Sequence, residues 1–301
     1  MIKERTFNNE KNTWVNLDTR SLSQTFELDQ KYGIDNEIIS YAIDKNERAR
    51  VEYVSETGIC TIIYNVTKQT NDTHHYETVP MTFLIKDNHL ISISNDDNYY
   101  IVEKMEHYLD DHLMDSLFEF LFASLLMMTD DYFPKIEEME RNRTLISNML
   151  REKTTKKNLL ALSDLETGGV YFISATNQNT AVLQQLKNHP LFQHLTASEI
   201  EKLDDVLIEA RQAAEMTQMD AQILQQLSGT YNNILNNNLN DNMKVLTTLS
   251  ILLTVPTIVT GFFGMNMPLP LEHDIYGWLI TIGISALGWF GLAFILRQIM
   301  K

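Results

Sequence analysis

Hydrophobic and polar positions follow two different patterns before residue 244. Up to about residue 102, short segments of β-branched and aromatic residues are separated by turn residues. This predicts strands at 13–17, 51–54, 59–66, 81–85 and 90–94. Between them, residues 33–44 place apolar side chains on one helical face. We therefore expect an α+β domain over residues 1–102.

From residue 103 to 243 the periodicity becomes helical, which predicts a helical domain. Gly168-Gly169 lies inside a polar cluster, and we expect the helices to be interrupted at 167–179. A second break is expected at His189-Pro190, just before the next helix begins. The run of residues 113–128 is also rich in apolar side chains, but it contains two acids and is short. A buried helix outside the membrane explains it better than a span.

A single long helix is predicted from about residue 197. Thr196 and Glu199 form a capping-box pattern, and no proline follows until Pro256. About 65 residues at 1.5 Å each make a helix of about 100 Å. A helix of that length cannot bury its apolar stripe within one small domain, so neighbouring copies are expected to cover it in a homo-oligomer.

Two uncharged runs, 245–263 and 276–296, are each long enough to cross about 30 Å of hydrocarbon as a helix. They predict a transmembrane hairpin over residues 244–301 with a short connecting loop at 264–275. Lys244 precedes the first run, and Arg297 and Lys301 follow the second. The positive-inside rule then puts both chain ends in the cytoplasm and the loop outside the cell membrane.

Composition narrows the possible functions. The chain has 301 residues, with 24 Lys and Arg against 40 Asp and Glu, and its net charge is −16. All of the excess negative charge falls before residue 245, which argues against nucleic-acid binding. One cysteine, Cys60, excludes an internal disulfide. No catalytic or nucleotide-binding motif is found, so we do not expect an enzyme.

One face of the first uncharged run is polar. Spacings of three or four place these side chains together: Met243, Leu246, Ser250, Thr254, Thr257 and Gly261. In lipid, hydroxyl groups and glycine belong at helix contacts or beside water. The periodicity alone favours tight helix packing and a water-filled pore equally.

The end of this run reads Gly264-Met265-Asn266, with the second run close behind. This motif in this position resembles the CorA-type magnesium channel family. The stretch 240–247 is similar to the family's entry into the membrane, and Pro256-Thr257 resembles its proline before the motif. Residues 130–133, Asp-Asp-Tyr-Phe, are similar to the start of a long family helix. The resemblance covers nearly the whole chain.

The resemblance implies a funnel-shaped homopentamer whose first spans line a pore. Asn266 would form a ring of neutral oxygens that accepts hydrogen bonds from the waters of a hydrated Mg²⁺. Gly264 and Met265 would shape the turn that holds Asn266. Leu246 would be a hydrophobic constriction, with Asn240 as a polar ring on its cytoplasmic side. Glu272 and Asp274 in the outer loop would raise the local cation concentration.

Regulation and ion preference also follow from the resemblance. Relatives are closed by cytoplasmic Mg²⁺ bound to acids between subunits, but the helix aspartate of that site aligns with Gly229. The candidates left here are Asp204, Asp205 and Asp220. Met265 favours Mg²⁺ over zinc, with Co²⁺ and Ni²⁺ as secondary ions. The alternatives are a zinc-transporting relative, or a membrane-anchored cation sensor or scaffold that uses the hairpin only as an anchor.

Overall fold

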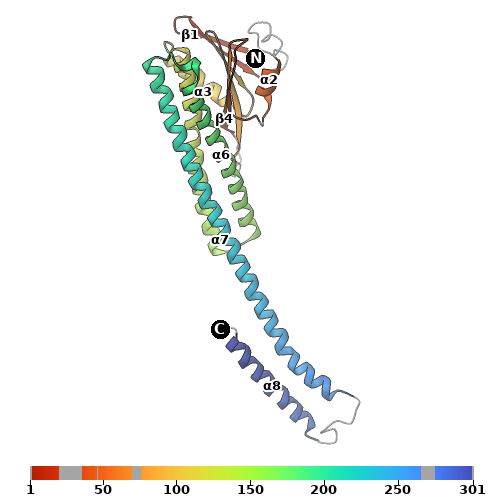
Figure 1. The fold of residues 1–301 in the computed structure, drawn as a ribbon. Helices are drawn as coiled ribbons and strands as arrows, with labels where there is room; N and C mark the ends of the chain where they lie inside the picture. The colour runs from red at the N-terminus through yellow and green to blue at the C-terminus, as the bar shows by residue number, and fades with distance from the viewer. Residues whose placement is uncertain (1, 20–35, 46, 70–75, 266–274, 300–301) are drawn as a thin grey trace. The chain divides into compact units, whose positions relative to one another are not determined.

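The structure is a computed structural model that describes residues 2–19, 36–45, 47–69, 76–265 and 275–299. The chain divides into two compact units, Met1–Gly229 and Thr230–Lys301. The first unit holds a β-sheet and the long helices beside it, and the second holds the C-terminal part of one long helix and a final helix (Figure 1).

The six described strands form one sheet in the order β1-β2-β6-β5-β4-β3. Their bounds are β1 Ile2–Phe7, β2 Asn12–Asp18, β3 Arg50–Val54, β4 Ile59–Thr67, β5 Thr78–Lys86 and β6 His89–Ser94. Neighbours pair antiparallel, except β2 and β6, which are parallel. All five predicted strands are confirmed. Every residue of β4 is buried, as expected for a strand covered on both faces.

The first strand, β1, was not predicted from the sequence. Its charged residues are typical of a solvated N-terminus, but two of its cations pair with acids of the helix α3, Tyr99–Asp111. Lys3 Nζ lies 2.7 Å from a carboxylate oxygen of Glu106, and Arg5 lies 2.7 Å from Asp110. The charges therefore attach an edge strand to the helix packed on the sheet.

Helices cover both faces of the sheet. On one face, the helix α2 (Asn36–Ile43) packs Ile39 against Val15, Leu84 and Ile91. On the other, α3 and α4 (Leu117–Asp130) complete the main core, in which Phe120, Leu121 and Phe122 are fully buried. The prediction of a buried helix at 113–128 is confirmed. It begins later than predicted because Ser116 caps it, with its hydroxyl accepting from the Glu119 N–H.

The interruption expected at 167–179 is wrong. The helix α5 (Tyr132–Glu152) is followed by α6, which runs unbroken over Lys156–Asn188. At both glycines of this segment, side chains from other parts of the fold lie close to the α6 backbone. A Cβ on Gly168 would lie 2.7 Å from the Cβ of Tyr76, and one on Gly169 would lie 3.6 Å from that of Ala221. The polar residues of the segment are also used inside the fold, since buried Asn179 donates to the Asn65 carbonyl at 2.7 Å.

The second expected break and the long helix are confirmed. After α6, the 3-10 helix η2 (Pro190–Phe192) leads to α7, which spans Ala197–Phe263. Its capping box is present, since the Thr196 N–H donates to the Glu199 carboxylate at 2.7 Å and the Glu199 N–H donates back to the Thr196 hydroxyl at 3.3 Å. The 67 residues of α7 make a helix about 100 Å long.

Candidate ion pathway

The two uncharged runs form helices in the second unit. The first is the C-terminal part of α7, and the second is α8, Gly277–Ile299. Both helices are long and apolar enough to cross a membrane, and the apolar window of each is unburied within the single chain. A soluble core helix of this composition would be buried, so these helices need another apolar environment.

One side of the first span is covered by α8. Its less exposed side chains recur at helical spacing through Leu252, Val255, Val259 and Phe263. The contact with α8 is close, because a Cβ on Gly288 would lie 2.9 Å from a methyl carbon of Val255. Glycine on α8 thus lets the two helices approach, as small residues do in membrane helix pairs.

The polar face predicted from the sequence lies on the opposite side of α7. Its members are all exposed in the single chain, with Leu246 at 62% and Met243, just before the span, at 56%. Ser250, Thr254, Thr257 and Gly261 continue this face. Since α8 occupies the other side, the polar face is free to meet either water or further copies of α7.

The hydroxyl groups of this face have already used their hydrogens. Ser250 donates to the Leu246 carbonyl at 2.9 Å, Thr254 to the Ser250 carbonyl at 2.9 Å, and Thr257 to the Leu253 carbonyl at 2.8 Å. Each hydroxyl oxygen retains two lone pairs and so remains an acceptor. The face therefore offers neutral oxygens that can accept hydrogen bonds from water.

Of the Gly264-Met265-Asn266 motif, the structure describes the first two residues. Gly264 follows the last residue of α7, and a Cβ there would lie 2.9 Å from the Thr260 carbonyl oxygen. The Met265 N–H donates to the Phe262 carbonyl at 3.4 Å, which turns the chain after the helix. Asn266, Glu272 and Asp274 lie outside the described residues.

On the N-terminal side of the apolar run, α7 carries no charged residue from 221 to 240. Asn240 is exposed and lies with Met243 at the edge of a groove of about 640 Å³ beside Leu296 of α8. The next charges are Asp241 and Lys244, whose side chains are 3.0 Å apart and both exposed. The approach to the span is thus lined mainly by amide groups.

The three candidate regulatory acids do not meet in the single chain. Asp204 pairs with Lys187, and Asp205 is exposed beside it. Asp220 is sixteen residues further along α7, about 24 Å away, and is buried 3.1 Å from Nε of Arg143. Burial raises the pKa of Asp220, Arg143 lowers it, and Glu140 raises it again. Among the described residues, no cluster of three His, Cys, Asp or Glu could hold a metal ion.

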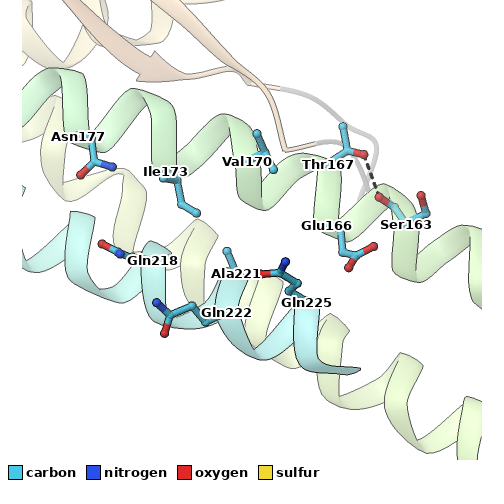
Figure 2. Close-up of a pocket in the computed structure, with 10 residues that line it drawn as sticks. All are labelled: Ser163, Glu166, Thr167, Val170, Ile173, Asn177, Gln218, Ala221, Gln222 and Gln225. Atoms are coloured by element: carbon cyan, nitrogen blue, oxygen red, sulfur yellow. Dashed lines mark hydrogen bonds between the residues drawn. The ribbon is translucent and has the colours of Figure 1, made fainter. Parts of the chain in front are cut away.

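A groove of about 540 Å³ lies between α6 and α7, and its described lining carries few charges (Figure 2). Glutamines 218, 222 and 225 come from α7, and the facing side chains come from α6. Among the described residues, Glu166 is the one ionisable side chain that lines it. A single carboxylate among amides does not make a strong cation site, so the described lining of this groove supplies no metal ligand set.

Comparisons with known proteins match almost the whole chain. A family model described as CorA-like Mg²⁺ transporter protein matches residues 9–298. The cobalt/magnesium transport protein CorA of Methanocaldococcus jannaschii is 23% identical over 288 residues, which are 93% of this chain and 88% of that protein. The complete structure of that organism's CorA magnesium transporter aligns with a TM-score of 0.81 at 21% identity, over 98% of this chain and 93% of the other. The full-length CmaX protein aligns with a TM-score of 0.71 at 12% identity, over 95% and 88%.

Proposed function

The chain belongs to the CorA-like Mg²⁺ transporter family, and on that premise we propose that it carries Mg²⁺ across the cell membrane as a homopentameric channel. The observation that carries the proposal is the free polar face of α7, which lies opposite the side covered by α8. Five copies of that face around one axis would enclose a path, with α8 in an outer ring and both chain ends in the cytoplasm.

The path suits an ion that keeps its water. Mg²⁺ dehydrates reluctantly and holds its waters in an octahedron. Those waters are hydrogen-bond donors, and the hydroxyl oxygens of Ser250, Thr254 and Thr257 are acceptors whose own hydrogens are already bonded. Neutral acceptors bind the hydrated ion weakly enough for it to leave, which conduction requires.

At the outer mouth, we propose that a ring of Asn266 selects the hydrated ion. Gly264 supports this role indirectly, since a side chain there would press on the Thr260 carbonyl and alter the turn before Asn266. Glu272 and Asp274 would attract cations to the mouth from outside.

At the inner end, a ring of Leu246 would stop conduction by excluding water, with Asn240 as a polar ring below it. We propose that cytoplasmic Mg²⁺ favours this closed state by screening the repulsion between bodies of strongly negative charge. Of the three candidate acids, Asp205 forms no ion pair within the described part of the chain, so it is the one most available to an added cation.

The transported ions are proposed from the family and from one relative. The M. jannaschii relative is named for cobalt and magnesium, and Met265 favours Mg²⁺ over zinc. Mg²⁺ is therefore the proposed main ion, with Co²⁺ and Ni²⁺ as secondary ones.

The test measures Mg²⁺ influx into liposomes that contain the purified protein, using a dye trapped inside. Replacing Thr254 and Thr257 by Val keeps their shape and removes the acceptors. We expect influx to fall about thirtyfold, because two lost hydrogen bonds at about 1 kcal/mol each sum to about 2 kcal/mol. Thr248→Val is the matched control, since Thr248 is half-buried and its hydroxyl also bonds a carbonyl of its own helix. Equal loss in the control would contradict the role of the polar face, and no influx in any protein would favour an anchor for a sensor or scaffold.

A further inference from the structure

An asparagine-rich segment lies on α7 just before the first apolar run, within the second unit. Seven of the eleven residues from 232 to 242 are asparagines, and all seven side chains are exposed on a continuous helix. Asparagine is a weaker helix former than the Glu, Gln or Lys that commonly cover a solvated helix. A segment with so many asparagines therefore has a cost that exposure to solvent does not explain.

Two of these asparagines continue the polar face of α7. Asn236 is seven residues and Asn232 eleven residues before Met243, so each points within about 20° of the direction of Met243. Asn237 and Asn238, by contrast, point about 120° and about 140° away from it. The polar face therefore extends about 17 Å beyond Met243, toward the N-terminus of the helix, through two further amide side chains.

Neither of the two amides is used within the chain. Asn232 and Asn236 are exposed, and neither forms a hydrogen bond with another described residue. They differ in this from the hydroxyl groups of the polar face, whose hydrogens are bonded to carbonyls of their own helix. Each amide oxygen has two lone pairs and can turn them toward a ligand.

Contact between copies of α7 does not require these amides. Leu239 is 60% exposed and points about 40° to one side of Met243, and half-buried Leu235 points about 80° to the same side. Apolar side chains in such a row can contact a neighbouring helix, as they do along the seam of a coiled coil. The amides beside that seam would then face the axis that the copies share.

The segment also lacks charge in a chain that is rich in acids. No charged residue occurs on α7 from 221 to 240, although the chain has 40 Asp and Glu. A ring of carboxylates would hold a divalent cation tightly, and a ring of lysines would repel it. Amide oxygens instead accept hydrogen bonds from the waters of the ion and bind it weakly enough for it to leave.

The spacing of the two amides suits one hydrated Mg²⁺. Four residues separate Asn232 from Asn236, so rings of these residues would be about 6 Å apart along the helix. Mg²⁺ holds its waters at about 2.1 Å, and a water donates over about 2.8 Å, so an acceptor lies about 4 to 5 Å from the ion. An ion midway between the rings is about 3 Å from the plane of each, and its waters can reach both.

We propose that Asn232 and Asn236 form a second site for hydrated Mg²⁺, in which the ion keeps its octahedral waters and these donate to two rings of amide oxygens. The site would hold the ion between the cytoplasm and the Leu246 constriction, and it rests on the proposed homopentameric channel. It requires no carboxylate or imidazole ligand, in agreement with the lack of any such cluster among the described residues.

The test is cryo-electron microscopy of the full-length protein in lipid nanodiscs, once with millimolar Mg²⁺ and once with EDTA. We expect density on the symmetry axis midway between residues 232 and 236, about 4 to 5 Å from the amide oxygens, with Mg²⁺ only. The variant N232A/N236A should lose this density, and its helix is retained because alanine is the best helix former. The matched control N237A/N238A removes two exposed amides that point elsewhere and should keep the density.

Three results would overturn the site: no density in the wild type, density that persists in N232A/N236A, or amides of neighbouring copies bonded to one another in its place. Mg²⁺ influx into liposomes separates this outcome from that of the channel. Influx without the density overturns the site alone, and density without influx overturns the channel alone. An assembly in which the copies of α7 share no axis would overturn both.

Discussion

The buried ion pair between α5 and α7 gives a sharp test of what holds the long helix. The side chains of Asp220 and Arg143 are only 6% and 11% exposed, and their charged atoms are 3.1 Å apart. Neither carboxylate oxygen of Asp220 has a hydrogen bond within the described chain. Arg143 is therefore the main compensation for a charge that burial has taken out of water.

Replacing Arg143 by Met removes the cation and leaves a side chain of similar length. Breaking a buried pair in this way costs about 3 to 5 kcal/mol, which corresponds to a fall in Tm of about 6 to 20 °C for a unit of this size. Adding Asp220→Leu removes the stranded charge and should recover most of the loss, because an apolar pair can replace a buried ion pair at little cost.

The stability lost in Arg143→Met should also depend on pH, and the direction of that dependence can be derived. Burial already raises the pKa of Asp220, and losing Arg143 raises it further, because Arg143 favours the ionised form. A carboxyl group whose pKa is higher in the folded state stabilises the fold at low pH and loses that contribution as the pH rises through the raised pKa. The variant should therefore differ most from the wild type at neutral pH and approach it as the pH falls.

The assay is thermal unfolding of the detergent-solubilised full-length protein, followed by tryptophan fluorescence. Arg141→Met is the matched control, since Arg141 is on the same helix but pairs with Glu137 at 3.6 Å in solvent, where a pair is worth about 0 to 1 kcal/mol. If both variants lower Tm equally, or if Asp220→Leu fails to recover the loss, the pair does not act as described.

Two further predictions concern packing and helix ends, and unfolding of the full-length protein measures both. Gly168→Ala should destabilise by about 1 to 3 kcal/mol, because its Cβ would overlap that of Tyr76, whereas Gly229→Ala has open space and should stabilise by about 1 kcal/mol. The reverse order would show that the close approach at α6 is not real. Glu199→Ala removes the carboxylate that accepts from the Thr196 N–H in the capping box of α7 and from the Ser116 hydroxyl, and should cost about 2 kcal/mol. A neutral result would mean that water replaces both bonds.

The elements that depend only on residues near one another in the sequence could be predicted from the sequence. The strands β2 to β6 follow from alternating and β-branched segments, and the start of α7 follows from Thr196 and Glu199. The two helices that are long and apolar enough to cross a membrane follow from the absence of charge, and the polar face of α7 follows from spacing alone.

What could not be predicted depends on residues far apart in the chain. From the sequence alone, Gly168 indicates a helix break. In the structure, Tyr76, which lies 92 residues earlier, occupies the space that a side chain at position 168 would need. Asp220 looks like a free metal ligand until Arg143 is found beside it. No local pattern reveals either partner, because tertiary contacts override local propensity.

The most direct test of the central claim is Mg²⁺ influx into liposomes, with Asn266→Ala compared to the wild type at the same oligomeric state. Asn238→Ala is the matched control, because it removes an exposed amide away from the polar face. With low internal Mg²⁺, so that the pore is free to open, we predict strong influx in the wild type and the control and a collapse in Asn266→Ala. Equal influx in all three proteins would contradict the role of Asn266, and negligible influx in all three would contradict the channel itself.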